Sequence, residues 1–434
     1  MIEIYKTLAN EWKERGIPEI VAREKGLSSY ADLKIPKIIV ATGFRRTGKT
    51  YLLFGLMKKL LNNKTREQVV YINFEDERVP AKTEFLTGLM PALKQLLGGK
   101  IEFLFLDEVQ NMPGWSKWLR RINDTEKTRL FVTGSSSKMT SREIPTELRG
   151  RFLEVNILPL SFREWLLFKG LSAKITSDKT TENGKAEALR ALNEFIENGG
   201  MPEVALSEKS KAFEIIQSYY NTVVRKDIIE RHKIKNEESL KALLLLLLNS
   251  TSYTISRTYN TLKSLNFSVG KTTLQRYISY IENSYLMYSL PIFSFKVKDQ
   301  MQYARKVYFI DNGFINFLST KFSKGISRLY ENAVFLELLR RRKKTDSELC
   351  YWRSEAKEEV DFVVTNGRKA MQLIQVCYDI SDYETKKREV RALLKASKEL
   401  KCRNLLIITE DKEGEEKLQG KKIRYIPLWK WLLA

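Results

Sequence analysis

The residues whose types and spacing indicate chemistry most clearly form the segment Gly43 to Thr50, which reads GFRRTGKT. It matches the pattern GxxxxGK followed by Ser or Thr. In this pattern the glycines let the backbone N–H groups converge on phosphates, the lysine reaches the outer phosphates and the final hydroxyl binds Mg²⁺. The segment lies between the apolar run Ile38 to Ala41 and a helix-compatible stretch. The sequence therefore predicts a nucleotide site, which we take to be for ATP with Mg²⁺.

The residues expected to contact this nucleotide are those of the loop and its first helical turn. They are Gly43, Phe44, Arg45, Arg46, Thr47, Gly48, Lys49, Thr50 and Tyr51.

Two acids, Asp107 and Glu108, follow the apolar run Ile101 to Leu106. In a parallel sheet the carboxyl ends of the strands line the ligand crevice. We therefore expect Asp107 to support Mg²⁺ together with Thr50, and Glu108 to position the attacking water. Taken alone, the pair is also compatible with an ordinary strand end. The phosphate loop earlier in the chain favours the functional interpretation.

Further along, the segment LFVTGSSS predicts a strand that ends in hydroxyl groups. Thr133 and Ser135 are candidates for sensing the outer phosphate, although Ser and Gly clusters also form simple turns. The next basic segment, ELRGR, contains Arg151. An arginine there is a candidate finger acting on a neighbouring copy or a sensor within the chain. A solvated basic loop is the alternative.

These residues need a sheet to position them, and five β-rich runs alternate with helix-compatible stretches between residues 37 and 158. This alternation predicts an α/β fold with a parallel sheet covered by helices. The segments that follow predict a helical region. After it come three helices and two strands (IFSFKV and ARKVYFID) in the order of a winged helix. The last part of the chain predicts a second α/β unit. The predicted regions are 1–36 helical, 37–158 phosphate-binding core, 159–236 helical with a flexible loop at 172–188, 237–325 winged-helix-like and 326–434 α/β.

Composition limits the class of protein. The chain has 434 residues, 43% of them hydrophobic, which indicates a folded protein. Lys and Arg number 75 against 53 Asp and Glu, and the resulting net charge of +22 favours a polyanionic partner. One histidine and three cysteines without metal-ligand spacing argue against His-based catalysis, structural zinc and a disulfide framework. The longest apolar run, Ala242 to Leu248, is far shorter than the roughly 20 residues that span a bilayer, so we expect a cytoplasmic protein.

The segments GFRRTGKTYLL, FLFLDEVQ and FVTGSSS followed by ELRGR resemble the archaeal ATPases, a P-loop family of the AAA+ superfamily. The similarity continues through SFREW, GGMPEV, NTVVRKDIIER and RKVYFIDNGF, and so spans nearly the whole chain. It implies an ATPase core, a helical and winged-helix middle, and a C-terminal domain similar to PD-(D/E)XK nucleases.

That last resemblance implies a second Mg²⁺ site, with Glu331 as the helix acid and Asp361 as the strand acid. The next strand departs from the nuclease pattern. Gln375 stands where an acid belongs and Cys377 where a lysine belongs. The departure favours a degenerate domain over an active nuclease, with Lys357 and Lys369 as alternative sources of the missing cation.

Within the winged-helix-like region, the segment from Gly270 to Asn283 has the composition of a recognition helix. Its candidate contacts with double-stranded DNA are Lys271, Thr272, Thr273, Gln275 and Arg276. The alternative is a merely solvated face. The basic run Arg340 to Lys344 is a further candidate for phosphate contacts.

The sequence as a whole predicts a Mg²⁺-dependent ATPase associated with DNA. Two alternatives stay open, namely an ATP-dependent switch acting on proteins and an ATP-gated metal-dependent nuclease. An arginine finger in trans would require an oligomer, but a monomer is equally compatible with the residues.

Overall fold

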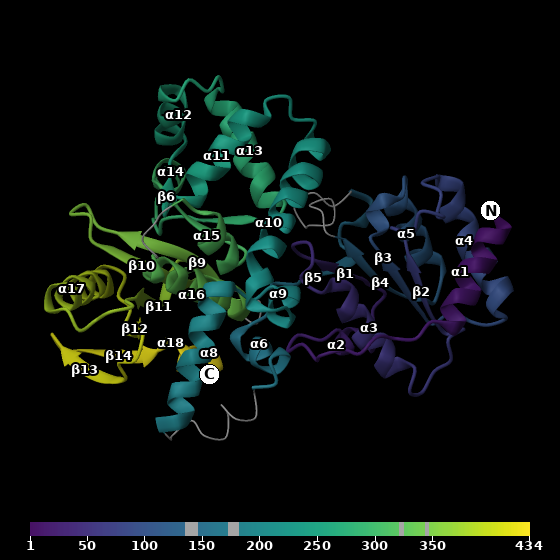
Figure 1. Cartoon of the computed structure of the whole chain (residues 1–434), viewed down its shortest axis with the longest axis horizontal. Helices are drawn as coiled ribbons and strands as arrows, with labels where there is room; N and C mark the ends of the chain where they lie inside the picture. The colour runs from purple at the N-terminus through teal and green to yellow at the C-terminus, as the bar shows by residue number, and fades with distance from the viewer. Residues whose placement is uncertain (135–145, 172–181, 321–324, 343–346) are drawn as a thin grey trace. The chain divides into compact units, whose positions relative to one another are not determined.

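The fold is taken from a computed structural model of the chain (Figure 1). The residues described are 1–134, 146–171, 182–320, 325–342 and 347–434. The chain divides into two compact units, Met1–Ile157 and Leu158–Ala434, and each is considered by itself. The finer division into five regions stays a prediction.

The first unit is built on five parallel strands in the order β2-β3-β4-β1-β5. The strands are β1 (Ile38–Thr42), β2 (Val69–Asn73), β3 (Phe103–Asp107), β4 (Arg129–Gly134) and β5 (Phe152–Asn156). All residues of β1 and β3 are buried, as expected when both faces of a sheet are covered. The predicted parallel α/β sheet is therefore confirmed.

Helices surround this sheet (Figure 1). They are α1 (Ile2–Glu14), α2 (Ser28–Ala31), α3 (Lys49–Leu60), α4 (Thr83–Leu97) and α5 (Trp115–Thr125), with single 3-10 turns at η1 (Val109–Asn111) and η3 (Thr146–Leu148). Helix α1 is fixed by two buried side chains whose polar atoms are satisfied. The Tyr5 hydroxyl donates to the carbonyl of Phe85 at 2.8 Å, and the Trp12 indole donates to the carbonyl of Val69 at 2.8 Å. The amphipathic N-terminal segment is thus part of the core of this unit.

The second unit begins with a helical region. Its elements are α6 (Phe162–Phe168), α8 (Glu182–Asn198), α9 (Pro202–Leu206), the 3-10 turn η4 (Lys209–Lys211), α10 (Ala212–Thr222) and a π-helix, η5 (Val223–Glu230). The predicted flexible loop at 172–188 is wrong for its last seven residues, which begin α8. The reason is the apolar stripe formed by Ala188, Leu192 and Ile196, all fully buried, which extends the helix back into the polar stretch. Residues 172–181 lie outside the described part.

A three-stranded sheet follows, in the order β6-β8-β7. The elements of this region are α11 (Glu237–Leu248), β6 (Ser252–Tyr253), α12 (Ile255–Ser264), α13 (Lys271–Asn283), β7 (Met287–Leu290), α14 (Val297–Gln302), β8 (Arg305–Phe309) and α15 (Asn312–Leu318). The three helices and the strand within ARKVYFID are confirmed. The strand predicted at IFSFKV is wrong. β7 lies just before it and ends at Leu290, where Pro291 follows, and a proline has no N–H to donate to a sheet.

A six-stranded mixed sheet, ordered β13-β14-β12-β11-β10-β9, forms the C-terminal part (Figure 1). Its elements are α16 (Ile326–Arg342), β9 (Ser347–Arg353), β10 (Glu359–Asn366), β11 (Lys369–Val376), α17 (Tyr383–Glu399), β12 (Leu405–Thr409), β13 (Gly414–Leu418), β14 (Lys421–Pro427) and α18 (Leu428–Leu433). The predicted second α/β unit is confirmed, although β13 and α18 were not expected. Among the described residues, the helices include none that is both long and apolar enough to cross a bilayer.

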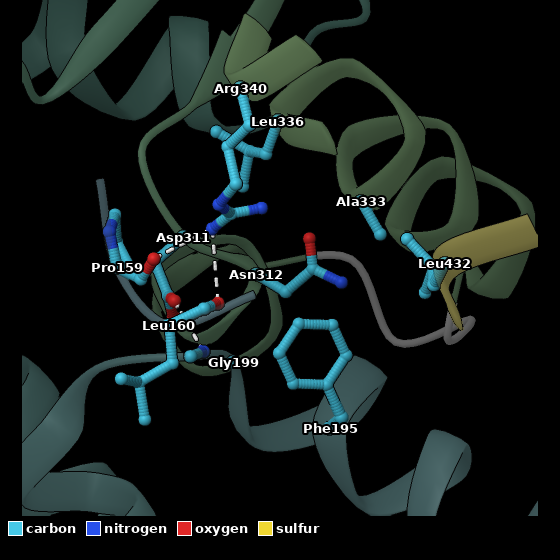
Figure 2. Close-up of a pocket in the computed structure, with 11 residues that line it drawn as sticks. Pro159, Leu160, Phe195, Gly199, Asp311, Asn312, Ala333, Leu336, Arg340 and Leu432 are labelled. Carbon is cyan, nitrogen blue, oxygen red and sulfur yellow. Dashed lines mark hydrogen bonds between the residues drawn. The ribbon is translucent and has the colours of Figure 1, made fainter. Parts of the chain in front are cut away.

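The carboxylate of Asp311, fully buried at the start of α15, joins this helix to the segment between α8 and α9 (Figure 2). It accepts the backbone N–H of Gly200 at 2.6 Å and that of Gly313 at 2.9 Å. Burial raises the pKa of Asp311 to about 7. Gly199 has a φ of +83°, and a Cβ there would lie 1.7 Å from Asp311 Oδ1. The close approach of backbone and carboxylate therefore requires glycine at this position.

We expect Gly199→Ala to lower the free energy of unfolding of the second unit by about 3 kcal/mol or more, since it adds a steric clash to a left-handed backbone. Gly170→Ala is the matched control, because Gly170 has a φ of +69° but no atom within 4 Å of the added Cβ. We expect the control to cost about 1 kcal/mol. Urea unfolding monitored by tryptophan fluorescence measures both. Equal losses for the two variants would contradict the requirement.

Candidate nucleotide-binding site

The predicted phosphate loop lies where β1 gives way to α3. Gly43 and Gly48 have φ values of +142° and +91°, in the region that favours glycine. A Cβ at Gly43 would lie 2.3 Å from the carbonyl oxygen of Ile157. Both glycines of the pattern are therefore needed by the backbone itself, and the loop curls at the carboxyl end of β1.

Lys49 lies within this curl and is 5% exposed. Its ammonium donates to the carbonyls of Gly43 at 3.2 Å and Phe44 at 3.0 Å. The loop is braced from outside by Arg23, which donates to the carbonyl of Thr47 at 2.9 Å. A buried ammonium beside a curled loop at a helix N-terminus is an arrangement suited to phosphate.

Asp107, at the end of β3, is the point at which three hydroxyl groups meet. Its Oδ2 accepts from the hydroxyls of Thr50 and Tyr71, each at 2.8 Å, and its Oδ1 accepts from the Thr133 hydroxyl. These donors come from α3, β2 and β4, so the carboxylate ties all three elements together. Hydroxyl and carboxylate oxygens are the ligands that Mg²⁺ prefers, and Thr50 with Asp107 fits such an ion.

Glu108 follows directly, with a φ of +52°. Its backbone N–H donates to the Thr133 hydroxyl at 2.9 Å, and its carboxylate accepts from Gln110. Thr133 therefore bridges the two acids, which places the expected metal, water-positioning and sensor residues at one edge of the sheet. The other expected sensor, Ser135, lies outside the described residues.

Tyr71 and Glu75 belong to this edge but were not predicted. Burial, followed by the charge of Asp107, raises the pKa of Tyr71, so the phenol stays a donor. Burial and the charge of Glu108 raise the pKa of Glu75, against the opposing charges of Arg45 and Arg46. Tyr71 lies in β2 and Glu75 just after it, and β2 pairs with β3 in the sheet. The signal that the sequence offered was that both residues lie in or just after a β-rich run.

Other predicted residues of the first unit lie differently. Phe44 is fully buried, whereas Tyr51 is 53% exposed. The backbone carbonyl of Arg151 accepts from Ile38 at the start of β1, the sheet edge opposite the loop. Its guanidinium pairs with Asp124 at 3.1 Å. The structure therefore does not bring Arg151 to the nucleotide site of its own chain, and a role in trans stays a prediction.

The predicted DNA contacts lie on α13 in the second unit. Lys271, Thr272, Gln275 and Arg276 are exposed, and Thr273 is half-buried. The other face of the helix is buried through Leu274, Tyr277, Ile278 and Ile281. In the basic run on α16, by contrast, Arg340 and Arg341 donate to the backbone carbonyls of Leu160 and Trp431. These two arginines serve packing within the unit.

Glu331 and Asp361, the acids expected to hold a second metal ion, lie together but around a lysine. The ammonium of Lys306 is 2.9 Å from Glu331 and 2.8 Å from Asp361. Burial lowers the pKa of Lys306, but Asp361, Glu331 and Glu359 outweigh burial and raise it above its usual value. Lys357 and Lys369, the alternatives considered for the cation, are exposed, whereas the cation that the structure places between the acids is Lys306. Within the described ranges, no cluster of acidic, Cys or His side chains is arranged to hold a metal.

Comparisons with known proteins show the family of this chain. Residues 36–166 match the family model of an AAA domain, while residues 189–325 and 327–431 match domains of unknown function, DUF8612 and DUF4143. An uncharacterized protein of Methanocaldococcus jannaschii, MJ1544, is 40% identical over 96% of this chain and 93% of its own length. The chain belongs to this family of AAA-domain P-loop ATPases with a DUF4143 C-terminal domain.

Another family relative, an uncharacterized protein of Haemophilus influenzae, is 28% identical over 84% of this chain and 88% of its own length. Among solved structures, the Walker-type ATPase of Pyrococcus abyssi matches with a TM-score of 0.44 and 12% identity, covering 66% of this chain and 91% of that one. So low a score carries no conclusion about this chain. The assignment therefore rests on the M. jannaschii relative and the AAA-domain match.

Replacing Tyr71 by Phe tests whether its phenol positions Asp107 for a metal ion. We expect Tyr71→Phe to weaken the apparent affinity for Mg²⁺, titrated into the protein with a fluorescent ATP analogue, by roughly tenfold, as is usual when a partner of a metal ligand is removed. Nucleotide affinity in EDTA should not change. Tyr5→Phe also removes a buried hydroxyl hydrogen bond and serves as the control. The positioning role would be excluded by identical Mg²⁺ curves for both variants.

Proposed function

We propose that this chain is a Mg²⁺-dependent ATPase that uses ATP to change its hold on double-stranded DNA. The observation that carries the ATPase part is the hydrogen bond between Thr50 and Asp107 beside the buried Lys49. In the proposed role Lys49 contacts the phosphates, Thr50 and Asp107 hold Mg²⁺, Glu108 orients the attacking water and Thr133 reports on the outer phosphate.

The DNA part of the proposal is supported by charge and by α13. A net charge of +22 favours a polyanion, and α13 presents two cations, Lys271 and Arg276, with hydroxyl and amide groups on one exposed face. The surrounding order of three helices and a three-stranded sheet is that of a winged helix, in which the third helix enters the major groove. Contact with DNA would thus be made by the second unit.

ATP turnover tests the catalytic proposal directly. We expect purified protein to hydrolyse ATP only with Mg²⁺, and turnover to rise when double-stranded DNA is added. Lys49→Ala should reduce turnover to background under both conditions, because the phosphates lose their cation. Phosphate release measured with and without DNA gives all four values.

Two outcomes would change the proposal. Turnover that Lys49→Ala retains would place hydrolysis elsewhere and overturn the assigned site. Turnover that requires Lys49 but ignores DNA would overturn the DNA part, and would favour an ATP-dependent switch that acts on proteins.

The α13 surface can be tested separately by the salt dependence of DNA binding. We expect the double variant Lys271→Ala with Arg276→Ala to weaken binding and to reduce the slope of log K against log salt by roughly 0.9 for each DNA phosphate that is no longer neutralised. The double variant Lys398→Ala with Lys417→Ala removes the same charge from exposed positions on α17 and β13. Fluorescence anisotropy on one duplex measures each slope. Equal slopes in the two double variants would show that α13 does not contact DNA.

A further inference from the structure

A buried lysine lies among three carboxylates in the second unit. Lys306, on β8, has a side chain that is only 7% exposed. Its ammonium is 2.9 Å from Glu331 Oε1, 2.8 Å from Glu359 Oε1 and 2.8 Å from Asp361 Oδ1. Glu331 belongs to α16 and the other two acids to β10. One cation therefore joins a strand of the small sheet to a helix and a strand of the C-terminal part.

The ammonium donates hydrogen bonds to Glu331 and Asp361 and forms an ion pair with Glu359. A protonated lysine has three N–H donors, and three carboxylate oxygens stand within reach. The remaining contacts hold the acids in place, because the Tyr308 hydroxyl donates to Glu331 at 2.6 Å and the Val376 N–H donates to Asp361 Oδ2 at 2.9 Å. The Glu331 and Asp361 carboxylates are thus positioned by groups other than Lys306 as well.

The neighbouring polar groups are committed elsewhere. Gln375 accepts the Asp361 N–H at 3.3 Å and donates to Glu389. The Cys377 thiol is directed at the carbonyl of Asp379 at 3.2 Å, and burial raises its pKa to about 12, so it stays neutral. Neither group supplies a charge to the cluster. Among the described residues, the cation that contacts all three acids is Lys306.

Three carboxylate oxygens converging on one point are also the donor set of Mg²⁺ or Mn²⁺. With all four groups ionised the cluster has a net charge of −2, and a divalent ion in place of the ammonium would reduce this to −1. The three acids are arranged around the ammonium and, among the described residues, form no metal site as they stand, so the metal implied by the nuclease resemblance does not fit while Lys306 is present.

We propose that the Lys306 ammonium permanently occupies the metal position of this carboxylate cluster, so that a buried cation joins β8 to the C-terminal part and no catalytic metal binds there. Lys306 is a structural cross-link between β8, α16 and β10. The cluster becomes a divalent-cation site only when this ammonium is removed.

The experiment is a Mn²⁺ titration of nucleotide-free protein, followed by electron paramagnetic resonance. We expect wild-type protein to take up no Mn²⁺ that depends on Asp361. We expect Lys306→Ala to gain about one bound Mn²⁺ per chain, and the double variant Lys306→Ala with Asp361→Asn to lose it. Lys386→Ala is the matched control, because Lys386 pairs with a single acid, Glu416, and its removal should create no site.

Thermal unfolding gives a second readout. Mn²⁺ should raise the midpoint of Lys306→Ala and leave that of the wild type unchanged. If Lys306→Ala does not fold, Mn²⁺ binding by the wild type still tests the proposal. A Mn²⁺ ion that the wild type binds and that Asp361→Asn does not bind would overturn it. A folded Lys306→Ala that binds no Mn²⁺ would overturn it as well. So would metal-dependent plasmid nicking by the wild type that Asp361→Asn abolishes.

Discussion

A buried carboxylate must find hydrogen-bond donors or a counter-charge, because leaving it unpaired away from water costs several kcal/mol. This constraint organises the molecule at three places. Asp107 is satisfied by hydroxyls, Asp311 by backbone N–H groups, and Asp361 by a lysine and a backbone N–H. In each case the partners come from different elements, so satisfying the charge also fixes how those elements pack.

The three buried carboxylates differ in the kind of group that donates to them, and this difference decides whether a metal ion fits beside each one. A hydroxyl group is a neutral hydrogen-bond donor. The oxygens of Thr50 and Asp107 are also of the type that Mg²⁺ takes as ligands. Backbone N–H groups cannot leave, so the Asp311 junction is purely structural. A lysine brings its own charge and excludes a competing cation. The same residue type is thus held by side-chain hydroxyls in the first unit and by backbone N–H groups or a lysine in the second.

This contrast distinguishes the resemblance to P-loop ATPases from the resemblance to metal-dependent nucleases. The phosphate loop keeps every residue that its chemistry requires, and the structure assembles Lys49, Thr50, Asp107, Glu108 and Thr133 at one sheet edge. The nuclease-like acids are also assembled, but Gln375 and Cys377 are tied to neighbours and Lys306 fills the centre. The two acids are therefore present without the acid and the lysine that the nuclease pattern has on the next strand. This chain thereby combines an assembled candidate nucleotide site with a C-terminal part that a buried lysine joins to β8.

The sequence by itself determined the phosphate loop, the parallel sheet around it and the second α/β unit, because these depend on local spacing and on apolar runs that span whole strands. It did not determine the start of α8, the end of β7, the roles of Tyr71 and Glu75, or the location of Arg151 at the opposite edge of the sheet. Above all, Lys306 lies 55 residues from Asp361 in the chain and carries no local signal. Only the tertiary structure brings them together, because the pairing of charges across elements depends on strand order and packing.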